Sequence, residues 1–292
     1  MFIHEKLETN HFSPSEQVIV TFLLEKQLQI ENLSTSEIAK ETYSSKSTIV
    51  KMAQRLGFKG WSDFKKVYIT ELHYLQSHQS TIDANYPFNE RDNIIAVANK
   101  IATLKQESIA ETASLLHYDS LQKATHLLTK SKSIHIFAVS NNLLIAQEFR
   151  YNMERIKKNV HVHAIQGEGM YAATLMDPTD CALIISYSGE TATLLTIVSL
   201  LKEQGIPMVL ISSLADSSMS SIADCTLRMA TKERLYSKIA TYANDASITY
   251  LLDVLYSCIF QTDYHKNAEL RKRTSRLFET GRKSNAGVLR EK

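Results

Sequence analysis

Five short apolar runs in the second half of the chain constrain the fold more than any other feature. They are rich in β-branched residues, and segments with helical spacing separate them, beginning near Asn142, Gly167, Gly189 and Ser217. Such alternation predicts an α/β domain, with a parallel sheet of about five strands and helices on both faces. The predicted strands are Ile134–Val139, Val160–Ile165, Cys181–Tyr187, Met208–Ser213 and Cys225–Met229, followed by a long helix over Ser237–Phe260.

The first part of the chain has helical periodicity instead. The segment Ser34–Glu37 is a capping box, which predicts a helix from Thr35 to about Glu41. After a polar interruption, a second helix is predicted over Lys46–Leu56, ended by Gly57 in a left-handed cap. The sequence therefore predicts two short helices joined by a tight turn.

The length of 292 residues suits two domains better than one. The composition, with 44% hydrophobic residues and only 8 glycines and 4 prolines, is typical of a helix-rich globular protein. A polar stretch with Pro87, residues 75–90, is the expected boundary. We expect an all-α domain over residues 1–76, a linker and bridging helices over 77–130, an α/β domain over 131–262 and a basic C-terminal tail over 263–292.

Several classes of protein are disfavoured. No segment approaches the roughly 20 apolar residues of a membrane-spanning helix, and residues 1–12 lack the parts of a signal peptide. We therefore expect a cytoplasmic protein with no membrane partner. Cys181, Cys225 and Cys258 lie far apart in apolar runs, so we expect thiols rather than disulfides or metal ligands.

Basic residues gather in two parts of the chain, although the formal net charge is only +2. Residues 40–66 hold seven basic residues against two acidic ones, a net +5, and residues 266–292 hold nine against three, a net +6. The second cluster is expected to be a solvated, partly frayed helix. The first cluster coincides with the predicted helix pair.

The start of the second helix of this pair has the side chains that a DNA-reading helix needs. Small hydrogen-bonding side chains at Ser44–Thr48 suit base edges, and nearby cations suit phosphates. Serine and threonine at a helix start can equally be simple caps, so the pattern alone leaves both interpretations open. The candidate phosphate contacts are Lys51, Arg55, Lys59, Lys65 and Lys66.

Residues 33–68, LSTSEIAKETYSSKSTIVKMAQRLGFKGWSDFKKVY, resemble the helix-turn-helix of RpiR-type regulators, most specifically over Leu56–Lys65. The resemblance implies that the second helix enters the major groove. Tyr43 departs from the usual Gly or Asn of the turn, and Lys51 stands where Arg is typical, which weakens the case for bidentate guanine recognition. The DNA-binding candidates are Ser45, Lys46, Ser47, Thr48, Lys51, Arg55 and Lys59.

The third predicted strand ends in a run of hydroxyls, Ser186–Thr191, that leads through Gly189 into a helix. A strand that turns into a helix N-terminus exposes unpaired amides, which favour an anion, and hydroxyls can donate further bonds to phosphate. The alternative interpretation is a helix capped by Ser188 with Glu190 in its first turn. The pattern favours neither.

Residues 134–260 resemble the SIS (sugar isomerase) phosphosugar-binding fold, whose phosphate loop the SYSGET run matches. Its other marks are Ser212, Ser213, Ser217, Met219, Ile222–Asp224 and Asp253. In the first loop, Ala138 and Ser140 replace the family's glycines and Asn142 replaces its serine, so the bound sugar or the pocket is expected to differ. The ligand-binding candidates are Ser140, Asn142, Ser186, Ser188, Gly189, Glu190, Thr191, Ser212 and Ser217.

No catalytic residue, metal or cofactor is nominated. Glu190 is expected to bind a sugar hydroxyl or to complement the helix dipole, and the alternation of His161 and His163 is too ordinary to indicate a metal site.

The hypothesis is a homodimeric or homotetrameric transcriptional regulator that binds operator DNA and responds to a phosphorylated sugar or amino sugar. Two rivals stay open: a sugar-phosphate isomerase or lyase with an accessory N-terminal domain, and a DNA-binding protein whose second domain only dimerises.

Overall fold

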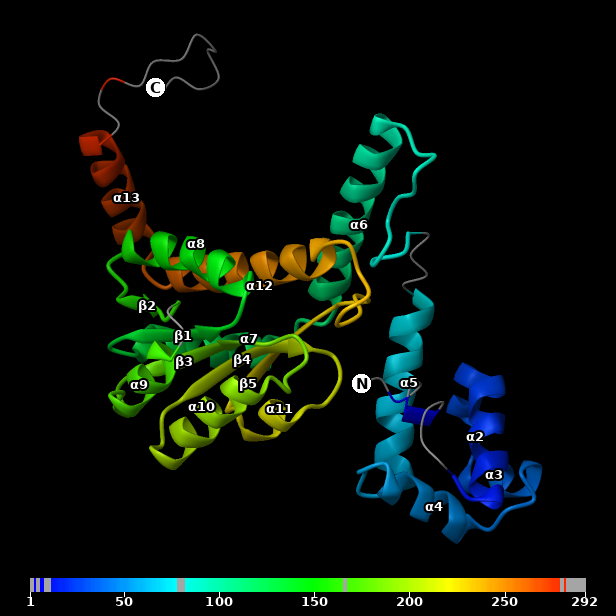
Figure 1. Cartoon of the computed structure of the whole chain (residues 1–292). Coiled ribbons are helices and arrows are strands. Elements are labelled where there is room, and N and C mark those ends of the chain that lie inside the picture. Colours follow the sequence, from blue (N-terminus) through cyan, green and yellow to red (C-terminus); the bar gives the residue numbers. More distant parts are fainter. Residues whose placement is uncertain are drawn as a thin grey trace. The chain divides into compact units, whose positions relative to one another are not determined.

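The computed structural model describes residues 3, 6–7, 12–77, 82–164, 167–278 and 281 (Figure 1). Contacts divide the chain into two compact units, Met1–Asp83 and Ala84–Lys292. Of the expected basic tail over residues 263–292, residues 263–278 and 281 are described, and the others lie outside the described residues. No helix among the described residues is long and apolar enough to cross a membrane.

The first unit is a small bundle of helices around one apolar core. Ile19 and Leu23, Ile49 and Phe64 are fully buried and come from three different helices, so the helices depend on one another for their apolar faces. The predicted capping box is confirmed, because Ser34 and Glu37 exchange hydrogen bonds with each other's amides. The helices are α2 (Pro14–Lys26), the short 3-10 helix η1 (Gln27–Asn32), α3 (Thr35–Glu41), α4 (Lys46–Arg55) and α5 (Trp61–Ser77).

The second unit contains the predicted α/β domain, with a five-stranded parallel sheet in the order β2-β1-β3-β4-β5. Its strands are β1 (Ile134–Ala138), β2 (Val160–Val162), β3 (Cys181–Ile185), β4 (Met208–Ser213) and β5 (Cys225–Met229). Its helices are α6 (Ile94–Ser114), α7 (Tyr118–Lys130), α8 (Asn142–Glu154), α9 (Glu168–Thr174), α10 (Ala192–Glu203), α11 (Ser218–Ile222), α12 (Tyr242–Gln261) and α13 (Tyr264–Phe278).

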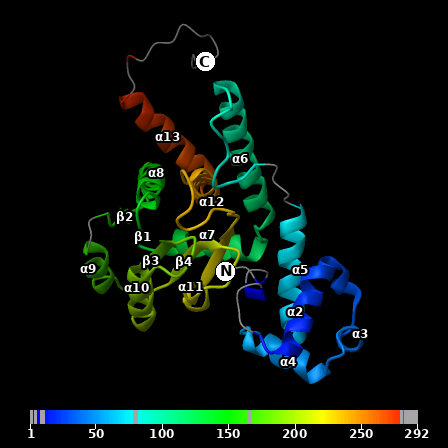
Figure 2. The same cartoon turned by 45° about the vertical axis from the view of Figure 1, so that its right-hand side comes forward.

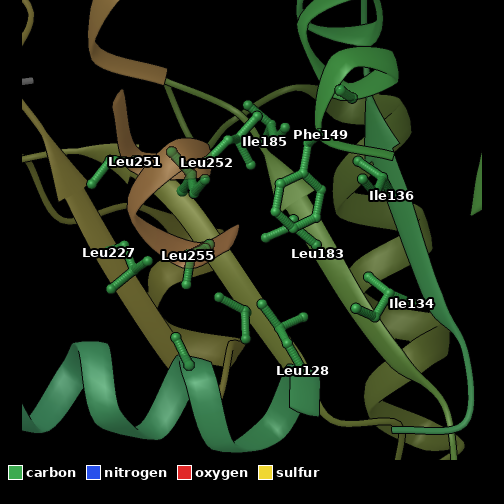
Figure 3. Packing of buried hydrophobic residues seen from close by; sticks show 14 of the residues in the cluster. Leu128, Ile134, Ile136, Phe149, Leu183, Ile185, Leu227, Leu251, Leu252 and Leu255 are labelled. Carbon is green, nitrogen blue, oxygen red and sulfur yellow. The ribbon is translucent and has the colours of Figure 1, made fainter. Parts of the chain in front are cut away.

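Helices cover both faces of the sheet (Figure 2). On one face, Leu128 of α7, Phe149 of α8 and Leu255 of α12 pack against the sheet strands (Figure 3). On the other face, α9, α10 and α11 bury side chains such as Leu194 and Met219. Because both faces are covered, β3 and the paired part of β4 are buried along their length and read as continuous apolar runs in the sequence.

Six predicted boundaries were wrong. The helix predicted over Lys46–Leu56 ends at Arg55, and the long helix ends at Gln261 instead of Phe260. The first and third strands end at Ala138 and Ile185, which are register partners, because the chain leaves the sheet for the loops beyond them. The second strand ends at Val162, because it is an edge strand that pairs with β1 alone. The long helix begins at Tyr242 rather than Ser237, because residues 231–241 form a loop. Glu233 in that loop accepts hydrogen bonds from the first amides of α12 at 2.7 and 3.1 Å.

Candidate functional site

The strand order places the loops that follow β1 and β3 next to each other. These neighbouring parallel strands continue into α8 and α10, which cover opposite faces of the sheet. The two connections therefore diverge at the carboxyl ends of the strands. This is the topological switch point at which open α/β sheets bind ligands. We call residues 186–191, after β3, the corner, and residues 139–142, after β1, the first loop.

The corner is built around a glycine that no other residue could replace without displacement. Gly189 has a φ of +64°, in the left-handed region. A Cβ atom there would overlap the Ser217 hydroxyl, lie 2.5 Å from the Ser217 Cβ and 3.1 Å from the Ser212 hydroxyl. Dihedral angle and space both require glycine, so Ser212 in β4 and Ser217 after it fix the course of the corner.

The N-terminus of α10 faces this corner without a side-chain cap. The N-cap residue is Thr191, and its side chain accepts no capping hydrogen bond. The alternative interpretation, a helix capped by Ser188 with Glu190 in its first turn, is therefore wrong, because Ser188 instead lies 3.3 Å from the amide of Glu190, outside the helix. Ser186 and Thr191 bring their hydroxyls within 3.3 Å of each other. Helix amides and hydroxyls thus converge where an anion would be stabilised.

Three of the predicted ligand contacts already serve the structure. The Glu190 carboxylate accepts a hydrogen bond of 2.7 Å from the amide of Ser218, at the start of α11. Ser217 caps the same helix by accepting from the Ser220 amide at 3.2 Å. Ser212 is fully buried and its hydroxyl donates to the carbonyl of Tyr187 at 3.5 Å. The arrangement gives these side chains a part in shaping the corner.

The first loop keeps the backbone conformation of a glycine without having one. Ser140 has a φ of +55° and is exposed. Asn141 donates a hydrogen bond of 2.8 Å to Asp245 at the start of α12, and Asp245 also accepts from Thr241 at 2.9 Å. Asn142, the first residue of α8, is half-buried. The loop is therefore ordered by a link to another element.

The loop of residues 231–241 also reaches the corner, and sequence reasoning missed it. Lys238 places its Nζ atom 5.0 Å from the centre of the Tyr187 ring and pairs with Glu233 at 3.1 Å. The Glu233 side chain has no exposed surface and that of Lys238 is 11% exposed. The sequence pattern had assigned part of this loop to a helix, which concealed the approach of its cation to the corner.

Histidines form a cluster on the β1–β2 edge of the sheet. The His135 Nδ1 and His163 Nε2 atoms lie 3.1 Å apart, and the ring of His161 is 4.8 Å from that of His135. Burial, and then the neighbouring imidazoles of His161 and His163, lower the pKa of His135 to about 4. Among the described residues, no group of three or more His, Cys, Asp or Glu side chains is arranged to hold a metal ion.

Asp253, the remaining mark of the SIS resemblance, lies in the middle of α12. It faces Glu148 of α8, and burial together with that carboxylate raises its pKa. The three cysteines are separate thiols, and burial raises the pKa of Cys181 to about 12.

In the first unit, α4 presents the predicted hydroxyls at its N-terminus. Ser45 is its N-cap and accepts a hydrogen bond from the Thr48 amide at 3.1 Å. The hydroxyls of Ser47 and Thr48 lie 2.7 and 2.9 Å from that of Ser45. Tyr43, in the turn before this helix, has a φ of +49° and is 98% exposed. Capping and base contact are compatible here, because each hydroxyl can both donate and accept.

The basic residues around α4 divide into exposed and engaged ones. Lys46, Lys51 and Lys59 are exposed on the surface of the unit. Arg55, by contrast, forms an ion pair of 2.8 Å with Glu16 of α2, and Lys65 donates to the Leu33 carbonyl at 2.8 Å. To contact a phosphate, Arg55 would have to break its ion pair with Glu16 or bind both groups at once.

Comparison with known proteins agrees with both units. Residues 3–81 match the helix-turn-helix domain of the rpiR family, and residues 127–251 match the SIS domain. The Vibrio vulnificus NanR protein complexed with ManNAc-6P is similar in fold, with a TM-score of 0.61 and 19% identity over 96% of this chain and 99% of that one.

Two further solved structures are similar to the second unit. An RpiR transcription factor from Sphaerobacter thermophilus, in its sugar isomerase domain, has a TM-score of 0.55 and 13% identity, over 62% of this chain and 98% of that one. A putative sugar-phosphate isomerase from Listeria monocytogenes has a TM-score of 0.54 and 13% identity, over 65% of this chain and 100% of that one.

By its two matched domains, the chain belongs to the RpiR-type regulators, in which an rpiR-family helix-turn-helix precedes a SIS domain.

Proposed function

We propose that this RpiR-type regulator is a cytoplasmic, homo-oligomeric DNA-binding protein whose affinity for its operator changes when a phosphorylated sugar or amino sugar binds at the corner. The observation that carries the proposal is the uncapped N-terminus of α10, which faces the hydroxyls of Ser186 and Thr191 at the switch point. The amides would hold the phosphoryl group, with Ser188 as a further donor. Ser140 and Asn142 would contact the sugar from the first loop.

Glu190, Ser212 and Ser217 would act on the ligand indirectly, by holding Gly189 and the amides in place. The Glu190 carboxylate accepts the Ser218 amide through its Oε1 atom, which ties it to the start of α11. We therefore propose that the site binds its ligand without converting it. An isomerase would instead show turnover of a sugar phosphate, lost on E190A, when the products are followed by NMR.

The ligand half of the proposal is tested by thermal shift. A panel of hexose and amino-sugar 6-phosphates should include ManNAc-6P, because a protein of this fold is known in complex with it. A ligand at 100 times its Kd should stabilise the fold by about 2.7 kcal/mol. Inorganic phosphate and the unphosphorylated sugars are the controls. If the whole panel leaves the Tm unchanged, the second unit is a dimerisation domain and the proposal fails.

The DNA half is tested by the salt dependence of operator binding. K51A should weaken binding and lower the log–log slope against salt by about one unit, since one phosphate contact is lost. Lys59 gives a second variant of the same kind. K26A, at the end of α2 and outside the basic cluster, is the matched control. An unchanged slope for both K51A and K59A would exclude these residues from the phosphate contacts.

A further inference from the structure

The stretch that follows the division between the two units is attached to the loop of residues 231–241. Ala84 and Asn85, the first residues of the second unit, are 4% and 5% exposed. Neither belongs to a helix or strand. Their burial therefore comes from contacts with another segment, and the hydrogen bonds of Asn85 identify it.

Asn85 holds this loop at three points. Its Oδ1 atom accepts a hydrogen bond of 2.7 Å from the amide of Arg234, and its Nδ2 atom donates to the Lys232 carbonyl at 3.3 Å. Its own carbonyl accepts from the amide of Ile239 at 3.1 Å. One side chain and one carbonyl therefore fix both ends of residues 232–239.

The same loop approaches the corner from its other side. Lys238, next to Ile239, lies 5.0 Å from the ring of Tyr187, which is a corner residue. Three steps thus connect Tyr187 with Asn85: the contact of its ring with Lys238, the peptide bond from Lys238 to Ile239, and the hydrogen bond from the Ile239 amide. Asn85 is two residues beyond Asp83, the last residue of the first unit.

The part of the loop between the contacts of Asn85 buries few apolar side chains. The side chains of Leu235, Tyr236 and Ile239 are 55%, 91% and 47% exposed, so little apolar burial opposes movement of the loop. A ligand that interacts differently with two positions of the loop would shift their populations. The hydrogen bonds of Asn85 to this loop would transmit that shift to the segment that leads into the first unit.

We propose that Asn85 is a positioning residue that couples the corner to the DNA-binding unit by holding residues 232–239. The inference rests on the function proposed above and identifies how binding at that site reaches the DNA. Asn85 is not expected to touch the sugar phosphate. Its loss should therefore uncouple the two activities without removing either.

The test compares N85A with N89A in the full chain. Asn89 is an exposed residue of the same stretch, and its side chain accepts only a local hydrogen bond from the Arg91 amide, at 2.9 Å. The probe is the sugar 6-phosphate that gives the largest thermal shift in the panel above. Two quantities are measured for each protein: the ligand-induced Tm shift, and the ratio of operator affinities with and without ligand.

Allosteric factors are typically 5–150-fold, and N85A should reduce the wild-type ratio at least threefold while the Tm shift persists. N89A should keep both. N85D, which keeps the acceptor for Arg234 but loses the donor to Lys232, should give an intermediate ratio and decides the question if N85A does not fold. A wild-type ratio in N85D or N85A, or an equal loss in N89A, overturns the coupling. If ligand binding leaves the operator affinity of the wild-type protein unchanged, this result contradicts the proposed function instead.

Discussion

The corner and the first loop follow neighbouring strands, yet different residues adopt the left-handed backbone conformation that each loop contains. Each has one left-handed residue, Gly189 with a φ of +64° and Ser140 with +55°. In the corner, neighbouring side chains occupy the space that a Cβ would need. In the first loop, the Ser140 side chain is exposed. In the corner, the dihedral angle and the lack of space for a Cβ atom both require glycine, whereas in the first loop only the dihedral angle favours it.

The two loops also differ in how they are tied to the rest of the unit. The corner is held by Glu190, an exposed side chain that accepts a hydrogen bond from the amide of Ser218. The tie of the first loop is the hydrogen bond from Asn141 to Asp245, whose Oδ1 atom is buried without a partner. A hydrogen bond to a carboxylate therefore holds each loop, and in the corner the packing around Gly189 adds to it.

The largest effect should come from placing a methyl group in the corner. G189A forces a Cβ against Ser217 and an alanine into a left-handed conformation, which should reduce the free energy of unfolding by about 2–4 kcal/mol. Urea unfolding of the second unit, followed by circular dichroism, measures this. Trp61, the single tryptophan, lies in the first unit, and its fluorescence should report an unchanged transition there.

Gly205 provides the matched control for this variant. It has a φ of +69°, and no atom lies within 4 Å of the position that a Cβ would occupy, so G205A should show the dihedral cost alone, about 1–2 kcal/mol. The double variant G189A/S217G removes the overlapping atoms and should recover part of the loss. Equal costs for G189A and G205A would show that space does not distinguish the corner.

An intermediate effect should come from removing the two hydrogen bonds that hold the corner and the first loop. N141A leaves the Asp245 carboxylate with one fewer donor in a half-buried site, so the free energy of unfolding should fall by about 1.5–3 kcal/mol. E190A removes an exposed tie and should cost about 0.5–1.5 kcal/mol. The same urea titration measures both. If E190A proves the more costly, the order of the first loop does not depend on the hydrogen bond from Asn141.

Much of the fold followed from local patterns. The strands Met208–Ser213 and Cys225–Met229 were predicted with their observed bounds, because apolar runs with polar flanks mark them. The end of β2 could not be predicted in this way, because it depends on how far β1 pairs with it. The start of α12 depends on Glu233, a residue outside the helix that no periodicity identifies.

The site was predictable only where its residues adjoin in sequence. The corner is one continuous run, so its hydroxyls and glycine were visible together. The bond from Glu190 to Ser218 spans 28 residues and the pair of Arg55 with Glu16 spans 39. A count of local charges therefore nominated Arg55 as a phosphate contact without revealing its ion pair. The roles of Lys238 and Asn85 depend on tertiary contacts of the same kind.

The smallest effect should come from restoring glycine to the first loop. S140G relieves the left-handed strain of a non-glycine residue, about 1–2 kcal/mol, but it also increases the freedom of the unfolded chain, worth about 0.5–1 kcal/mol. The net gain in the free energy of unfolding should therefore lie between about 0 and 1.5 kcal/mol. S140A keeps the strain and should give none. A loss of stability in S140G would mean that the Ser140 hydroxyl has a stabilising partner. A gain that leaves ligand affinity unchanged would show that this serine is tolerated in the loop without being needed for binding.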